Sequence, residues 1–177
     1  MTTTLRFLLL TALTLLIGAC STLDRSAAPA IDRQALWVVL PFANHTETPL
    51  AGQRAERIAE TILHSKGIAR IKRYQDSLQQ DTLFDSGDGK QQQDALAWAR
   101  QQGASYGLAG AVDEWRYKVG VDGEPAAGVT LQIIDIASGE TLWSGAGGKS
   151  GWSREALSAV AQQLIRSLLD GGLSAAR

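Results

Sequence analysis

Cysteine is almost absent from this chain: its 177 residues contain one, Cys20. A single thiol excludes an internal disulfide and a metal site built from several thiolates. The two histidines, His45 and His64, have no partner at metal-ligand spacing, and neither an HExxH pattern nor a serine-nucleophile elbow occurs. The net charge is −1, so no basic excess points to nucleic acid. The sequence therefore predicts a protein that is not an enzyme and that does not bind nucleic acid.

Residues 1–19 have the layout of a secretory signal peptide. Arg6 precedes an apolar run from Phe7 to Ile17, which is too short for a membrane-spanning helix. The run ends in IGAC, which resembles a bacterial lipobox, where the cysteine, here Cys20, is lipidated and becomes the first residue of the mature protein. An ordinary signal peptide followed by an incidental cysteine is the alternative. Because lipidation would consume the one thiol, the mature chain would have no cysteine nucleophile.

Lipidation would attach the protein to the lipid of the bacterial envelope, and two or three acyl chains give stable attachment. Ser21 follows the cysteine, where an aspartate would commonly mark retention at the inner membrane. The sequence therefore predicts the periplasmic face of the outer membrane. Residues 20–33 are interpreted as the lipidated cysteine and a flexible tether, which spans about 20 Å as a coil. A single periplasmic domain over residues 34–172 and a tail over residues 173–177 complete the chain.

Hydrophobic patterns in residues 34–172 predict a single α/β domain with the order β-α-β-α-β-β-β-α. The first strand is expected to be buried on both faces and closed by Pro41, and the strands are expected at residues 35–40, 68–74, 106–118, 128–136 and 140–144. Helices that end at glycines are expected around residues 55–63, 95–99 and 157–168. Because the last three strands would form a β-meander, the sheet is expected to be mixed, with helices packed on it.

Two glycine-containing segments look like ligand loops, but both lack key residues. Gly148-Lys149-Ser150 lies between a strand and a helix, as in a phosphate-binding loop, yet the first glycine of that motif would fall at Trp143. Residues 85–89 lack the third- and twelfth-position carboxylates of a calcium loop, and we favour Asp88 as a helix N-cap. No nucleotide, metal or other cofactor is therefore expected.

Trp152 stands between the glycine-rich run and the last helix, and two roles are open for it. If Ser153 is the N-cap, Trp152 and Leu157 occupy the two positions of a hydrophobic staple. Leucine or valine would serve a staple equally well, whereas tryptophan suits the interface of a bilayer. We therefore predict that Trp152 faces the membrane, with Lys149 nearby to meet lipid phosphates.

The four other tryptophans lie in predicted helices or strands, and Trp143 ends one of these strands. Trp37 and Trp98 occur in patterns that predict core positions. Trp115 shares its strand parity with Asp113 and Tyr117, so its face of the sheet is mixed in character. The sequence therefore predicts either solvent exposure or a contact with another subunit for Trp115.

Several segments together resemble the PelC lipoproteins of Pel exopolysaccharide export. They are the lipobox, the strand VVLPF, the stretch from GASYGLAGAV to SGWSRE at residues 103–155, and the final helix. The wider similarity, from the first strand through the hairpin IIDIASGETLW, is to envelope lipoproteins of the curli-secretion and peptidoglycan-synthase-activator kinds.

This resemblance implies a non-enzymatic lipoprotein that forms a homo-oligomeric ring beneath the outer membrane. The ring would guide a partly deacetylated, cationic polysaccharide to an outer-membrane β-barrel porin. Acidic side chains lining a lumen would attract such a polymer, because a ring focuses their field. Asp113, Asp122 and Glu124 are the candidates. The alternative for the last two is purely local, with Asp122 making a turn and Glu124 solvating it.

Two other functions compete with the ring. A periplasmic activator of a peptidoglycan synthase would be monomeric and would need a long tether. Residues 21–33 reach only about 45 Å even when fully extended. An envelope hydrolase would need a nucleophile with its base, or a metal site, and the sequence has neither.

Overall fold

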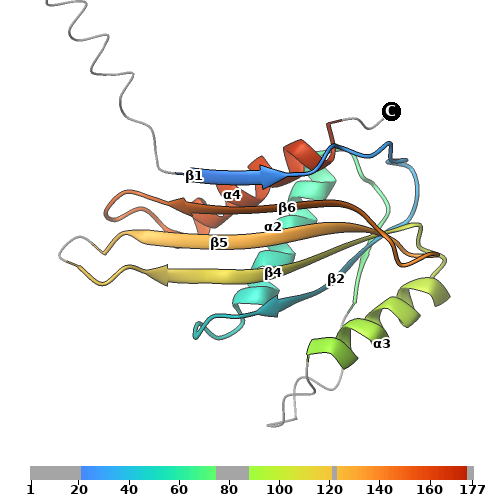
Figure 1. Ribbon diagram of the computed structural model, residues 1–177, viewed down its shortest axis with the longest axis horizontal. Coiled ribbons are helices and arrows are strands. Elements are labelled where there is room, and N and C mark those ends of the chain that lie inside the picture. The colour runs from blue at the N-terminus through green and yellow to red at the C-terminus, as the bar shows by residue number, and fades with distance from the viewer. Residues whose placement is uncertain (1–20, 75–87, 121–122, 175–177) are drawn as a thin grey trace, which may run out of the picture.

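One mixed β-sheet forms the centre of the computed structural model, which describes residues 21–74, 88–120 and 123–174 (Figure 1). Its strands are β1 (Ser21–Arg25), β2 (Trp37–Asn44), β3 (Ile71–Arg73), β4 (Tyr106–Tyr117), β5 (Pro125–Asp135) and β6 (Thr141–Ser150). They lie side by side in the order β1-β6-β5-β4-β2-β3. β2 pairs in parallel with β3 and β4, whereas β4, β5, β6 and β1 are antiparallel neighbours. The predicted mixed sheet with a late β-meander is confirmed.

The helices of the described ranges divide unequally between the two faces of this sheet. α2 (Ala51–Ser65) and α4 (Leu157–Gly172) contact each other and cover one face. α3 (Asp88–Gln101) packs on the opposite face, against β2. No described helix crosses β1 or β6 on that second face, which is turned to the viewer in Figure 1. The sheet is therefore fully covered on one side and only partly covered on the other.

The main core lies between the sheet and helices α2 and α4. Trp37 of β2 and Trp143 of β6 are fully buried there. On the other face, a smaller apolar cluster includes Ala95 and Ala99 of α3, and Trp98 packs half-buried against it. The core position predicted for Trp37 is confirmed, and Trp98 lies at the edge of the smaller cluster.

Glycines end two helices where the sequence predicts them. After α2, Gly67 takes a φ of +86°, and its N–H donates to the carbonyl oxygen of His64 at 3.0 Å. The N–H of Ile68 donates to the carbonyl oxygen of Leu63 at 3.2 Å. These two bonds form a Schellman motif, which requires a left-handed residue at the position of the glycine. Gly103, with a φ of +68°, follows α3 in the same conformation.

Strand β2 continues through Pro41, which corrects the prediction that the proline closes it. The register with β4 shifts between Val39 and Phe42, so Pro41 sits at an irregularity where its missing N–H costs no ladder bond. Just beyond, the N–H of Phe42 donates to the carboxylate of Glu56 at 2.9 Å. Gly52 of α2 lies so close to the Phe42 carbonyl that a Cβ there would collide with it. The first turns of α2 are therefore docked directly onto this irregularity.

Burial raises the pKa of the Glu56 carboxyl above its ordinary value of 4.5, although the bond from Phe42 and the charge of Arg73 lower it. A carboxyl with a raised pKa in the folded state stabilises the fold at low pH, and this contribution is lost as the pH rises through that pKa. Glutamine at position 56 keeps an acceptor and removes the charge. We therefore expect Glu56→Gln to gain stability relative to the wild type between pH 4.5 and neutrality.

Urea unfolding at several pH values measures this difference in the free energy of unfolding. The exposed Glu47 supplies a matched control, because Glu47→Gln removes the same charge without a buried partner. A difference between Glu56→Gln and the wild type that does not change with pH contradicts the prediction.

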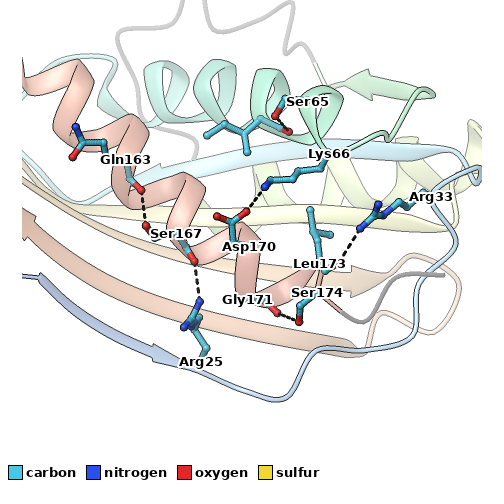
Figure 2. A network of polar contacts seen from close by, with 11 residues as sticks. Arg25, Arg33, Ser65, Lys66, Gln163, Ser167, Asp170, Gly171, Leu173 and Ser174 are labelled. Carbon is cyan, nitrogen blue, oxygen red and sulfur yellow. Dashed lines mark hydrogen bonds and ion pairs between the residues drawn. The ribbon is translucent and has the colours of Figure 1, made fainter.

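The segment predicted as a flexible tether is part of the fold, which corrects that prediction. Ser21–Arg25 forms an edge strand antiparallel to β6. The guanidinium of Arg25 donates to a carbonyl of α4 at 2.9 Å, and that of Arg33 donates to the Leu173 carbonyl at 3.1 Å (Figure 2). Between them, Ile31 is buried in the core. Because STLDR has one apolar residue in five, its sequence gives no alternation that would predict a strand.

The glycine-rich run after Trp143 belongs to β6 rather than to a loop. A Cβ on Gly145 would meet the Trp143 ring at 2.7 Å, and one on Gly147 would meet Leu23 Cδ2 at 2.7 Å. On α4, a Cβ on Gly172 would meet the Trp143 ring at 2.9 Å. The glycines therefore let β1, Trp143 and α4 pack closely against one another.

Candidate functional site

The predicted lipidation site adjoins one end of the sheet. Cys20 is followed directly by Ser21, the first residue of β1, which pairs with Lys149 near the end of β6. The β4–β5 hairpin and the loop from β6 to α4 lie at this same end (Figure 1). We call it the anchored end and define it by residues 21, 117–120, 123–124 and 149–156. A lipid on Cys20 would therefore be attached beside these loops.

Large apolar side chains are exposed at the anchored end. Trp152 is 64% exposed, Tyr117 is 52% exposed, and Val119 is completely exposed. Three cationic side chains accompany them, the half-buried Lys118 and Lys149 and the exposed Arg154. Amphipathic aromatic rings next to basic groups are typical of surfaces that meet lipid headgroups.

Trp152 does not form a hydrophobic staple, so one of the two roles proposed for it is wrong. Helix α4 begins at Leu157 with Ala156 as its N-cap, rather than after Ser153. Trp152 instead opens a turn in which the N–H of Glu155 donates to the Trp152 carbonyl at 3.0 Å. The Glu155 carboxylate in turn accepts the N–H of Trp152 at 3.0 Å. The turn leaves the indole largely in solvent, and its contact with a membrane stays a prediction.

Of the three acidic candidates, the structure describes Asp113 and Glu124, and it places them at different points along the β4–β5 hairpin. Glu124 is exposed in the β4–β5 hairpin, and Asp122 lies outside the described residues. Asp113 lies within β4, where His45 Nδ1 is 2.9 Å from its Oδ1. The hydroxyl of Thr130 donates to its Oδ2 at 3.2 Å. Both oxygens of Asp113 therefore have partners within the chain, unlike an acid held free for a polymer.

Trp115 belongs to the core, which corrects the prediction of an exposed or subunit-contacting residue. Its side chain is 3% exposed. The register between β4 and β5 shifts between Val112 and Glu114, so Asp113 is the extra residue of a β-bulge. The bulge moves the alternation by one residue, and Val112 and Trp115 therefore both face the core under α2 and α4.

The sheet face that carries α3 presents small and polar side chains, and no motif in the sequence marks them as a site. A row of cross-strand partners runs over it from β1 to β2: Asp24, Ala146, Thr130, Ala111 and Ala43. None of them belongs to the core under α2 and α4. Beside α3, this row borders a groove of about 350 Å³ that Gln92 and Gln132 also line. We call the row, together with Asp113, the open face.

The described part of the chain supplies no metal centre: it contains no group of three His, Cys, Asp or Glu side chains placed to hold an ion. Within residues 21–74, 88–120 and 123–174, no helix is long and apolar enough to cross a membrane. The features that stand out in these ranges are therefore two surfaces, the anchored end and the open face.

Comparison with known proteins defines the class first. A family model for the peptidoglycan-synthase activator LpoB matches residues 24–148, from β1 to β6. The lipoprotein GNA1162 of Neisseria meningitidis shares the fold, with a TM-score of 0.57 and 15% identity over 77% of this chain and 96% of that chain. No curated protein sequence matches. Fold and family match together place the chain in the LpoB class of α/β domains.

Two solved structures are much more similar in sequence. A PelC dodecamer from Paraburkholderia phytofirmans has a TM-score of 0.74 and 42% identity over 89% of this chain and 99% of that chain. A point variant of the same protein, also a dodecamer, has the same TM-score and identity over 86% and 97% of the two chains. The chain belongs to the PelC family.

Proposed function

We propose that this chain is a non-enzymatic lipoprotein on the periplasmic face of the outer membrane. It assembles as a homo-oligomeric ring and guides a cationic exopolysaccharide to an outer-membrane porin. The observation that carries the proposal is the likeness to PelC, whose solved structures are dodecamers that align with 86% and 89% of this chain. A protein of this kind needs surfaces for lipid, polymer and neighbouring protomers rather than a catalytic centre.

In this proposal the anchored end faces the bilayer. Arg25 ties β1 to α4, so a lipid on Cys20 has no slack segment between it and the folded domain. The acyl chains would hold the exposed ring of Trp152 at the level of the headgroups, with the ammonium of Lys149 beside lipid phosphates. The domain would therefore have a fixed orientation on the membrane.

Replacing Trp152 with alanine is expected to weaken binding to anionic vesicles about thirtyfold, since burying a large apolar side chain contributes about 2 kcal/mol. The thermal stability should not change, because the side chain is largely exposed and staples no helix. Flotation of the unlipidated protein with phosphatidylglycerol vesicles measures the binding. Trp152→Phe, which keeps an aromatic ring, should retain most of it. Equal flotation of Trp152→Ala and the wild type contradicts a membrane contact.

Acidic residues of the β4–β5 hairpin are the polymer-guiding groups in this proposal. Glu124 is exposed there, and Asp122 is two residues before it in the sequence. A ring multiplies these carboxylates around one axis and draws a cationic polymer towards the porin. Asp113 is left out of this set, because His45 and Thr130 already bind its carboxylate.

The match to the LpoB family model supports activation of a peptidoglycan synthase as a second candidate function. An activator anchored in the outer membrane must reach an enzyme across the periplasm. Here the strand that begins at Ser21 leaves no tether next to Cys20, because residues 21–33 pack along the domain. The export function therefore fits the structure better.

Deletion of the gene in the producing bacterium tests the proposal. We expect secreted polysaccharide to disappear and polymer to accumulate in the periplasm, with both effects reversed by the wild-type gene. Unchanged secretion together with altered peptidoglycan cross-linking would instead support the activator function and contradict export.

A further inference from the structure

We infer that the open face of the sheet receives the helices of the next protomer, so that protomers pack face to back around the ring. We call the outward surface of α2 and α4 the helix layer. The inference rests on the proposed ring, and it assigns the two surfaces that the ring brings together.

A closed ring of many protomers requires two different, complementary surfaces on each protomer. This chain has such a pair on opposite sides of one sheet. On one side, α2 and α4 cover the core and present their outward surfaces. On the other side, α3 packs near β2 and leaves β1, β6 and part of β5 without a helix (Figure 1). A neighbour's helix layer on this side would complete a layer of helices on both faces of the sheet.

The open face is shaped to let helices approach closely. Ala43, Ala111 and Ala146 follow one another across the strands, separated only by Thr130 between the last two. On the same face, Gly128 of β5 pairs with Gly148 of β6. Side chains this small leave the sheet surface flat, and the groove beside α3 adds a hollow along it.

The charges of the two surfaces are complementary. Arg54 and Arg57 lie on the outward side of α2, opposite its buried stripe, and both are exposed. Neither guanidinium has an ion pair or hydrogen bond within the part of the chain that the structure describes. The open face carries the exposed carboxylate of Asp24 at its β1 edge, whereas the carboxylate of Asp113 is already held by His45 and Thr130. Arginine forks suit carboxylates, so Asp24 offers the guanidinium groups of α2 an acceptor on a neighbouring open face.

A second copy fits this surface better than lipid does. The exposed aromatic rings and the cations Lys149 and Arg154 are at the anchored end, whereas the exposed carboxylate of Asp24 lies on the open face and would repel anionic headgroups. The open face and the helix layer lie on the two opposite faces of the sheet, whereas the anchored end lies at one end of the strands. A ring that joins these two faces could therefore keep every anchored end in one plane. The bilayer and the neighbouring protomers would then contact different parts of each protomer.

Two variants of the chain from Ser21 onward, each defective in one surface, test the inference. In the helix variant, Arg54→Glu and Arg57→Glu reverse the charge of α2. In the face variant, Ala146→Arg places a long cation in the centre of the open face. All three substituted positions are exposed, so circular dichroism should show an unchanged fold. Ala137→Arg, the same exchange at the exposed β5–β6 turn, is the matched control.

Analytical ultracentrifugation, at a concentration where the wild type is fully assembled, measures the oligomeric state of each variant and of their mixture. We expect the control to assemble as the wild type does and each variant alone to be monomeric. An equimolar mixture should form a heterodimer, because the intact open face of the helix variant can receive the intact helices of the face variant. Variants that assemble normally, or monomers that fail to combine on mixing, overturn the inference while the ring stands. A wild type that is itself monomeric overturns the proposed ring.

Discussion

Replacing Cys20 with alanine is expected to release the protein from the outer membrane and to reduce polymer secretion to the level of a deletion strain. Each buried methylene of an acyl chain contributes about 0.8 kcal/mol, so two or three chains far outweigh one exposed tryptophan. Membrane fractionation and the amount of surface polysaccharide measure the two effects.

A neighbouring exchange provides the control for the anchor. Ser21→Ala changes the next residue, which is exposed at the start of β1, and should leave both localisation and secretion unchanged. If the Cys20→Ala protein stays in the membrane fraction and supports secretion, the cysteine is incidental to an ordinary signal peptide. That outcome would also remove the basis for orienting the anchored end towards the bilayer.

Valine at position 147 is expected to destabilise the domain by about 3 kcal/mol, at the upper end of the cost of overpacking. A Cβ on Gly147 would already meet Leu23 Cδ2 at 2.7 Å, the Thr22 carbonyl oxygen at 2.8 Å and Leu164 Cδ1 at 3.0 Å. Because one of these contacts is backbone, β1 must move away from β6, and the two further methyl groups of valine increase the displacement. Chemical denaturation of the chain from Ser21 onward measures the loss.

The next glycine along β6 is the control for this effect. A Cβ on Gly148 would meet only the hydroxyl of Thr22, at 3.7 Å, so Gly148→Ala should be tolerated and could gain a few tenths of a kcal/mol from the less flexible unfolded chain. Equal losses for Gly147→Val and Gly148→Ala would show that β6 resists any substitution. The packing of β1 against Gly147 would then not be the cause.

The sequence predicted those parts of the fold where one local signal agrees with the tertiary structure. The apolar stripe that includes Ala55, Ala59 and Ile62 predicts the buried side of α2, and Gly67 predicts its end. The alternation of β5 was also informative, because Val129, Leu131 and Ile133 all face the main core. In these elements, periodicity reports burial directly.

Irregular positions could not be predicted from periodicity. The extra residue Asp113 reverses the alternation of β4, so parity placed Trp115 on the wrong face. Pro41 looks like the end of a strand, yet the register shift accommodates it. β1 has no pattern of its own and is held by contacts with β6 and α4 that lie more than a hundred residues away. Each of these features depends on partners that are distant in the sequence.

The candidate site was predicted only in part. The exposure of Trp152 agrees with a membrane-facing role, although the start of α4 was placed too early. The open face was missed, although the polar residues Thr130 and Gln132 alternate with the core residues of β5 and could have indicated it. Such alternation indicates that one face of a strand packs on the core while the other carries polar side chains.

Multi-angle light scattering of the lipidated protein, extracted from membranes in mild detergent, tests the central claim most directly. The account predicts one species of uniform mass, a closed oligomer of many protomers that stays constant over a wide range of concentration. A protein that is monomeric at every concentration would contradict it.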